Sequence, residues 1–165
     1  MQYSIFKTRW GWFGLLGDDD GFRRTCLPLA DKEEVLFHLL ATIEGAPTQI
    51  KTFGDCQEQV QAYFEGQRID FGGVTVEVSG LGAFEQAVLR TLRGIRYGQT
   101  TDYTDLAARS GRPRAIRAAA NAVAKNPLPL IIPCHRILRK DGSLGGFSAP
   151  GGVDTKKRLL DLENR

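Results

Sequence analysis

One segment of this 165-residue chain combines residue types that are typical of a reactive centre. Cys134 and His135 follow a proline-rich stretch that begins at Asn126 and contains the apolar run Leu130-Ile131-Ile132. The prolines favour a stiff, non-helical backbone and the apolar run favours burial, so we expect the thiol in a dry, rigid place. A cysteine is nucleophilic as the thiolate, and a histidine oriented by an acid can take its proton. The segment therefore predicts a nucleophilic cysteine, although adjacency in the sequence alone does not make the two side chains face each other.

The other cysteines and histidines argue against disulfide or metal chemistry. Cys26, Cys56 and Cys134 are odd in number and far apart, which favours reduced thiols, with Cys56 serving in packing. Because the chain has only two histidines, a transition-metal site would have to gather distant residues. We expect no metal and no cofactor.

The charge of the chain is divided unevenly. Residues 1–79 hold 7 Lys and Arg against 12 Asp and Glu, a net −5, whereas residues 80–165 hold 15 against 7, a net +8. A basic half is typical of a protein that binds nucleic-acid phosphates, and a solvated surface is the alternative. The hydrophobic fraction of 42% can supply a packed core. Neither a membrane-spanning run nor a secretory leader is recognisable, so we expect no membrane partner and a cytoplasmic protein.

Residues 1–79 have the pattern of a small α+β unit. Phe6 to Leu16 and Phe22 to Leu29 are expected to form the two strands of a hairpin around the turn at residues 17–21. The three aspartates of that turn lack the ligand spacing of a calcium loop.

Two helices should follow this hairpin. The acids that come after Asp31 favour a helix start, and apolar residues recur at helical spacing from Val35 to Ile43. A second helix is expected over about Cys56 to Phe64. A linker near Ser79-Gly80 would divide the chain into a support domain, 1–79, and a second domain, 80–165.

The second domain has the pattern of a helix-turn-helix. Apolar residues recur on one helical face from Leu81 to Ile95, and Asp102 is placed to cap a short helix, Tyr103 to Arg109. Arg112-Pro113 then opens a helix that runs to about Lys125, with the proline at a favoured first position. Two helices joined by a short turn that contains glycine are typical of DNA-binding proteins.

The second helix of this pair combines a basic stripe with small residues. Its polar residues fall at intervals of three, four and four and comprise Arg114, Arg117, Asn121 and Lys125. The alanines among them are Ala118, Ala119, Ala120 and Ala122. A bare helix can approach another surface closely, which favours DNA binding over the alternative of an ordinary solvated helix.

The motif Pro133-Cys134-His135-Arg136, preceded by Asn126-Pro127 and followed by Gly145-Gly146-Phe147-Ser148, resembles the O6-alkylguanine-DNA alkyltransferase family. The resemblance covers about residues 81–163 and includes Tyr97-Gly98, Tyr103, Arg117 and Leu159-Leu160-Asp161-Leu162-Glu163. It implies an α+β fold class, with a small ribonuclease-H-like N-terminal domain and a helical, winged helix-turn-helix C-terminal domain.

The resemblance also implies an activity, that of a methylated-DNA–[protein]-cysteine S-methyltransferase. Cys134 would accept the alkyl group from O6 of a guanine flipped out of duplex DNA, irreversibly and once per molecule. His135 would relay the thiol proton through a water, and Glu163 would orient and charge that relay.

Further roles follow from matching positions. Arg117 would fill the space left by the flipped base, Tyr103 would crowd the adjacent phosphate and protonate the guanine anion, and Asn126 would join the recognition helix to the active site. The pocket would include backbone groups near Cys134 and Ile137, the Ser148 amide and the Phe147 ring. The minor groove would be contacted by Arg114, Arg117, Ala118, Ala119, Asn121 and Tyr103.

The expected partner is double-stranded DNA that carries O6-alkylguanine, with O4-alkylthymine as a second substrate to test. We expect a monomer, and cooperative packing along DNA stays open. Phe147 departs from the family, where tyrosine is frequent, and the loop at residues 148–152 is slightly long, which leaves the width of the pocket open.

Three alternatives remain. A non-catalytic sensor of alkylated DNA would bind the lesion without repairing it, but such proteins hold another residue at the cysteine position. A winged-helix transcription regulator would place Arg114 and Arg117 in the major groove of one operator. A cysteine hydrolase or redox sensor would use Cys134, His135 and Glu163 on a different substrate.

Overall fold

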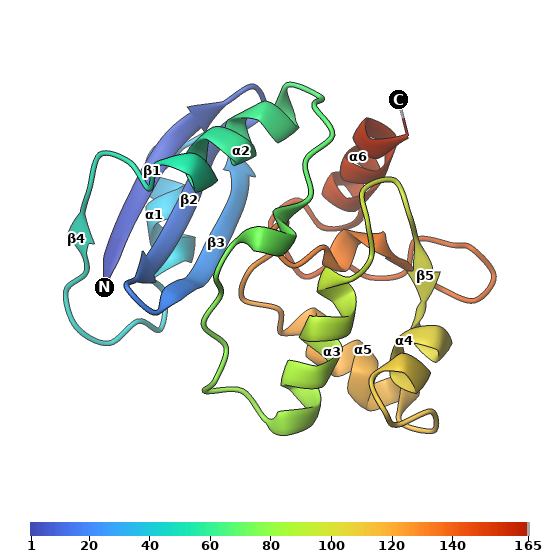
Figure 1. Ribbon diagram of the computed structural model, residues 1–165. Helices are drawn as coiled ribbons and strands as arrows, with labels where there is room; N and C mark the ends of the chain where they lie inside the picture. Colours follow the sequence, from blue (N-terminus) through green and yellow to red (C-terminus); the bar gives the residue numbers. More distant parts are fainter. Residues whose placement is uncertain (165) are drawn as a thin grey trace. The chain divides into compact units, whose positions relative to one another are not determined.

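The computed structural model describes residues 1–164. Its contacts divide the chain into two compact units, Met1–Glu77 and Val78–Arg165. This division lies two residues before the linker expected from the sequence, and each unit is a mixture of helices and strands (Figure 1).

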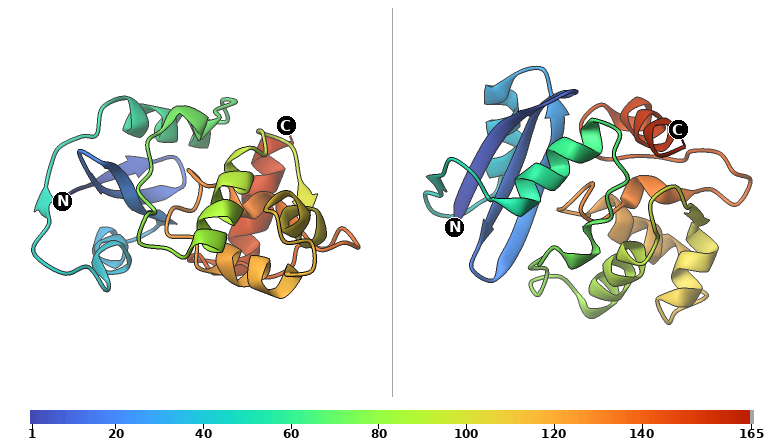
Figure 2. Two further views of the ribbon diagram at one scale, coloured as in Figure 1. Left: turned by 60° about the horizontal axis from the view of Figure 1, so that its bottom comes forward. Right: turned by 45° about the horizontal axis from the view of Figure 1, so that its top comes forward.

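The first unit is a four-stranded sheet with a helix on each face. Its elements are β1 (Gln2–Thr8), β2 (Gly11–Asp18), β3 (Gly21–Leu29), α1 (Lys32–Leu40), β4 (Thr48–Gln49), α2 (Asp55–Phe64) and a 3₁₀ turn at Phe71–Gly73. The strand order is β3-β2-β1-β4, antiparallel except for the parallel pair β1 and β4. Figures 1 and 2 show α1 and α2 on opposite sides of this sheet.

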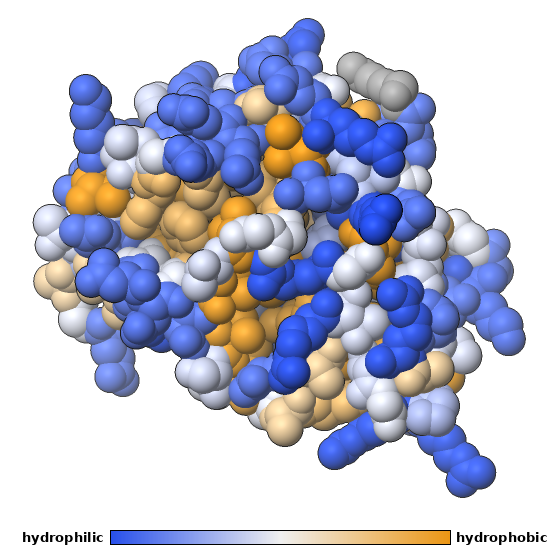
Figure 3. All heavy atoms as spheres, in the orientation of Figure 1, coloured by the Kyte–Doolittle hydropathy of each residue, from blue (hydrophilic) through white to orange (hydrophobic). Residues whose placement is uncertain are grey.

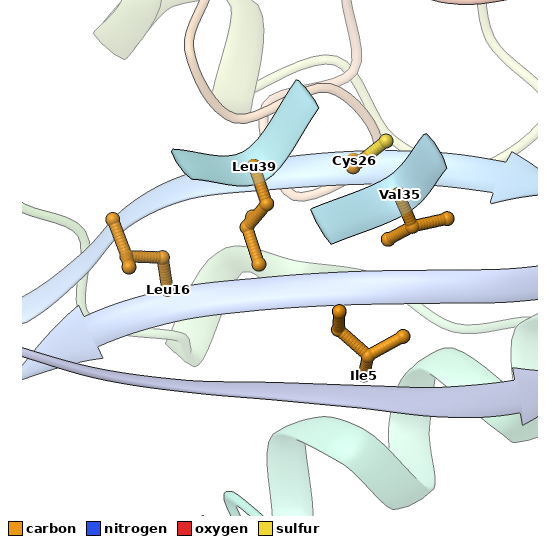
Figure 4. Packing of buried hydrophobic residues seen from close by; sticks show 5 residues of the cluster. All are labelled: Ile5, Leu16, Cys26, Val35 and Leu39. Atoms are coloured by element: carbon orange, nitrogen blue, oxygen red, sulfur yellow. The ribbon is translucent and has the colours of Figure 1, made fainter. Parts of the chain in front are cut away.

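Strand alternation supplies both of the cores that these helices cover. Ile5, Leu16 and Cys26 pack against Val35 and Leu39 of α1 (Figure 4). The neighbouring positions on the strands point to the opposite face. There the ring centroids of Phe6 and Phe13 lie 5.7 Å apart, and those of Phe13 and Phe64, which is on α2, lie 6.0 Å apart. The period-two alternation of strand side chains therefore produces the two-sided burial.

The predicted first strand, Phe6 to Leu16, is wrong, because the chain turns back within it. Thr8 makes this turn: its hydroxyl accepts from the Trp10 amide at 3.2 Å and donates to the Gly11 carbonyl at 2.9 Å. Gly11 has φ +138°, and a Cβ there would meet the Leu29 carbonyl oxygen at 2.4 Å. The aromatic residues around the turn made it look like continuous strand. The two predicted helices of this unit are confirmed as α1 and α2.

The second unit is mostly helical. Its elements are α3 (Ala83–Arg93), β5 (Thr101–Asp102), α4 (Tyr103–Arg109), α5 (Ile116–Ala124), a 3₁₀ turn η2 (Cys134–Arg136), β6 (Ile137–Leu138) and α6 (Gly152–Glu163). Helices α3, α4 and α5 pack on one another, α6 packs on η2, and β5 pairs with β6 in parallel. Asp102 caps α4 as predicted, since its carboxylate accepts from the amides of Thr104 and Asp105 at 2.7 and 3.0 Å.

The predicted start of the next helix at Arg112-Pro113 is wrong, because α5 begins at Ile116. Residues 112–115 form a separate turn closed by the Ala115 amide and the Arg112 carbonyl at 2.9 Å. Ala115 has φ −94° and ψ +41°, outside the helical region, so the proline belongs to the turn. Arg114 consequently lies before the helix and not on its polar stripe.

Hydrophilic side chains cover most of the face that Figure 3 shows, and apolar side chains appear between them. No helix within residues 1–164 is both long enough and apolar enough to cross a membrane.

Candidate active site

Cys134 lies at the wall of a cavity in the second unit. The cavity has a volume of about 270 Å³ and is lined by Tyr103, Ala120, Val123, Ala124, Cys134, Gly146, Phe147 and Ser148. Only 5% of Cys134 is exposed, so little of this residue is open to solvent. A concave site with a mostly apolar lining is suited to a small, mostly apolar ligand.

Asn126 and a strained leucine fix the backbone that leads to this cysteine. The Asn126 side chain donates to the Ile132 carbonyl at 2.9 Å and accepts from the Leu128 amide at 3.0 Å. Between these contacts, buried Leu130 has φ +80°, a left-handed conformation that a leucine rarely adopts. Asn126 therefore positions the thiol, and a hydrogen bond from its side chain also favours the thiolate.

His135, the residue after Cys134, forms a buried pair with Glu163. His135 Nε2 lies 2.8 Å from Glu163 Oε1, with both side chains at most 1% exposed. His135 Nδ1 is buried and has no hydrogen-bond partner among the described residues. Because the carboxylate holds the proton on Nε2, the lone pair of Nδ1 is available to accept another proton.

The protonation states of the pair suit a base. Burial lowers the pKa of His135, against the opposing effect of the Glu163 carboxylate, so the imidazole is neutral at pH 7. Burial would raise the pKa of Glu163, but hydrogen bonds from His135 and Arg136 outweigh it and hold that pKa well below its usual range. Burial raises the pKa of the Cys134 thiol, which Lys156 partly opposes, so the thiol needs a base to react.

Arg136 is a further part of this network to which the sequence analysis gave no role. Its guanidinium contacts both oxygens of Glu163 at 2.9–3.2 Å and donates to the Ile95 carbonyl at 2.6 Å. Glu163 Oε2 also accepts from the Gly98 amide at 3.1 Å, and the Tyr97 hydroxyl donates to the Leu162 carbonyl at 3.2 Å. The end of α6 is thereby tied to η2 and to the loop after α3.

Lys156 is a second residue that the sequence analysis missed. It is completely buried on α6, and its ammonium donates to the carbonyl oxygens of Leu144 and Gly146 on the cavity loop. Burial lowers its pKa to about 8, while the Cys134 thiolate would favour its charge. The spacing of Lys156, Leu159 and Glu163 at three and seven residues places them on one helix face, and this signal was available in the sequence.

The predicted pocket residues do not all come together. Tyr103, Phe147 and Ser148 line the cavity with Cys134, and the Ser148 hydroxyl donates to the Ala124 carbonyl at 2.6 Å. Ile137, near which a backbone group was predicted to contribute, is not among the lining residues and lies in β6, paired with Thr101.

Of the predicted DNA-contact residues on and before α5, some are exposed and one is buried. Arg117, Ala118 and Asn121 are exposed on α5, and Arg114 is exposed in the preceding turn. Ala119 is completely buried, so the expectation that its side chain contacts DNA is wrong. Alanine spacing alone could not separate the exposed face of α5 from its inner face.

Within residues 1–164, no three histidine, cysteine or acidic side chains lie close enough together to hold a metal ion. All three cysteines are free, and burial raises the pKa of both Cys26 and Cys56 to about 12. Cys134 lines the cavity described above and directly precedes His135 in the chain.

A family model described as 6-O-methylguanine DNA methyltransferase, DNA binding domain, matches residues 83–165. A methylated-DNA–protein-cysteine methyltransferase of Haemophilus influenzae is 41% identical over 115 residues, which are 70% of this chain and 63% of that protein. Another, from Methanosarcina acetivorans, is 32% identical over 167 residues, covering 99% of this chain and 98% of the relative. The crystal structure of Mycobacterium tuberculosis OGT in complex with DNA matches with a TM-score of 0.80 at 29% identity, covering 99% of this chain and 93% of that one. The match thus spans less than two thirds of the first relative but nearly all of the second.

Proposed function

The chain belongs to the 6-O-methylguanine DNA methyltransferase family, and from this premise we propose that it repairs DNA by moving an alkyl group from O6 of guanine to its own Cys134. The observation that carries the proposal is the Cys134 thiol at the wall of a cavity, directly followed in the chain by His135, whose buried pair with Glu163 leaves Nδ1 unpartnered among residues 1–164. A neutral base near a protonated thiol can remove its proton and so generate the nucleophilic thiolate.

The proposed reaction is a single displacement. His135 takes the thiol proton, through a bridging water, and the resulting imidazolium is stabilised by Glu163. The thiolate attacks the alkyl carbon, a C–S bond forms, and the C–O6 bond breaks with its electron pair going to guanine. Tyr103 at the cavity wall gives its proton to the guanine anion. The thioether is stable, so each molecule acts once and needs no cofactor.

The substrate must be flipped out of the duplex, because O6 is unreachable in stacked DNA. Exposed Arg117 near the start of α5 would fill the vacated space, with Ala118 and Asn121 allowing close approach in the minor groove. Tyr103 would crowd the flanking phosphate, and Asn126 would carry the position of α5 to the thiol.

We also propose a fold type for each of the two units. The sheet order β3-β2-β1-β4 supports a ribonuclease-H-like N-terminal domain with a supporting role. The α4–α5 pair, with β5 and β6 beside it, supports a winged helix-turn-helix. The M. tuberculosis protein was crystallised with DNA, and the net +8 of residues 80–165 fits the same partner. The protein would bind as a monomer.

Intact-mass spectrometry tests the transfer. The protein is incubated with a duplex containing one O6-methylguanine and with an undamaged duplex. We expect a gain of one methyl group per molecule, mapped to Cys134, with the damaged duplex alone. The Cys134→Ala variant should gain nothing, while Cys56→Ala, which removes another buried thiol, should behave as the unchanged protein. Tight binding of the lesion without any mass change would instead identify a damage sensor.

A further inference from the structure

Arg139 lies in a tight turn directly after β6. Its amide donates to the Ser143 carbonyl at 2.8 Å, and its carbonyl accepts from the Gly142 amide at 2.9 Å. These bonds fix the backbone on both sides of the residue. The side chain is exposed, and its charge also acts on Asp141, two residues further along the turn.

The Arg139 side chain shares a neighbour with Tyr103. A Cβ built on Gly145 would lie 3.4 Å from Arg139 Cγ, 3.7 Å from Arg139 Nε and 3.7 Å from Tyr103 Cε2. Gly145 has φ +67°, a left-handed backbone that favours glycine. The guanidinium stem and the phenol ring therefore flank Gly145, which directly precedes the cavity-lining Gly146.

Two charged groups, Cys134 as thiolate and Arg139, act on the Tyr103 phenol. Burial raises the pKa of the phenol, a thiolate at Cys134 raises it further, and the Arg139 cation lowers it. Lys156 from α6 acts on Cys134, and Asp102 on the phenol's own side is engaged with the amides of α4. Arg139 is therefore the group that favours release of the phenol proton.

We propose that Arg139 is a positioning residue for Tyr103, whose guanidinium stabilises the phenolate that forms when Tyr103 gives its proton to the departing guanine. This inference rests on the proposed function. The O–H electron pair stays on the Tyr103 oxygen, the proton moves to the guanine anion, and solvent later returns a proton to the phenolate. The negative charge thus passes from thiolate to guanine to phenolate, next to Arg139.

Two variants separate charge from shape. Arg139→Gln removes the cation and Arg139→Lys keeps it. In single-turnover methyl transfer at saturating O6-methylguanine duplex, Arg139→Gln should lower the rate constant about threefold, the size expected for a partly screened charge pair, and Arg139→Lys should restore most of it. The dissociation constant for the duplex should change less than the rate constant.

A matched control and a double variant complete the test. Lys140 is exposed in the same turn and its charge acts on Asp102, so Lys140→Gln should leave the rate constant unchanged. In a Tyr103→Phe background, Arg139→Gln should have no further effect, because a group that acts through the phenol has nothing left to act on. An equal loss in both backgrounds, or a weaker affinity with an unchanged rate constant, would overturn the inference.

Absorbance titration gives a readout that does not depend on transfer. The ionisation of Tyr103 is obtained as the difference between the protein and its Tyr103→Phe variant, with and without Arg139→Gln. We expect the pKa of Tyr103 to rise when Arg139 is replaced. An unchanged pKa overturns the inference even if methyl transfer proceeds, whereas absence of methyl transfer with a raised pKa counts against the proposed function alone.

Discussion

At the scale of single residues, the Glu163 carboxylate is the common hydrogen-bond acceptor of the site. It accepts hydrogen bonds from the buried side chains of His135 and Arg136 and from the Gly98 amide. Buried charges are tolerated only when they are paired, so each partner depends on the others. One side chain thus orients the imidazole of the proposed base and also ties α6 to the rest of its unit.

Replacing Glu163 should therefore damage stability as well as activity. Glu163→Gln leaves the Arg136 guanidinium buried without a countercharge, and we expect a loss of about 3–5 kcal/mol in the free energy of unfolding. Urea denaturation measures it. The control is Asp161→Asn on the same helix, whose ion pair with Lys157 is exposed, and it should change stability by less than about 0.5 kcal/mol. Similar losses in the two variants would contradict this account of the network.

The same network predicts how stability depends on pH. The pKa of His135 lies below its ordinary 6.5 in the folded protein, so acid favours the unfolded chain, which binds that proton first. The depressed pKa of Glu163 contributes stability that is complete above its ordinary 4.5 and is lost as the pH falls further. Both effects lower the free energy of unfolding as the pH falls.

Urea denaturation from pH 7.5 down to 3.5 tests this expectation. The free energy of unfolding should begin to fall below about pH 6.5 and fall more steeply below about pH 4.5. Glu163→Gln should flatten the second part of the curve. A variant curve parallel to that of the unchanged protein would show that other carboxylates cause the acid sensitivity.

At the scale of elements, a single cap positions Tyr103. Asp102 accepts from two amides of the first turn of α4, whose first residue is Tyr103. Asp102→Ala should cost about 1 kcal/mol in stability and slow methyl transfer, because the phenol then moves with a frayed helix end. Asp102→Asn should restore both, since asparagine also caps helices. Thermal unfolding and single-turnover rates measure the two effects, and failure of asparagine to rescue would point to a role of the carboxylate charge.

Some of these elements could be predicted from the sequence and others could not. The cap at Asp102 was predictable because its partners are two and three residues away. The role of Arg136 was not assigned because its partner lies 27 residues away. For Lys156 the helix-face spacing was available in the sequence, but its partners, 10 and 12 residues away, were not. Pro113 was misread as a first helical residue because proline favours turns as well as helix starts. Local hydrogen bonds are visible in a sequence, whereas partners brought together by the fold are not.

At the scale of the whole molecule, the excess of positive charge and the candidate active site lie in the same unit. The cavity and its charged network lie within Val78–Arg165, and the excess of cations lies in residues 80–165. Exposed Arg117 lies on the same helix, α5, as the two alanines that line the cavity, Ala120 and Ala124. A DNA backbone bound by these cations would therefore bring its bases close to the thiol. Helix α5 would then contribute both to DNA binding and to the cavity in which the proposed transfer takes place.

This placement predicts a steep dependence of DNA binding on salt. If about four phosphates are neutralised, the logarithm of the association constant should fall with a slope of about −3.6 against the logarithm of salt concentration, roughly a hundredfold loss between 50 and 200 mM. Fluorescence anisotropy with an undamaged duplex measures the slope. Arg117→Ala should make the slope about one unit shallower if its guanidinium contacts a phosphate, and it should leave the slope unchanged if the side chain enters the base stack. The proposed role of Arg117 requires the second result together with a slower transfer, and a shallower slope with normal transfer would reassign this residue to the DNA backbone.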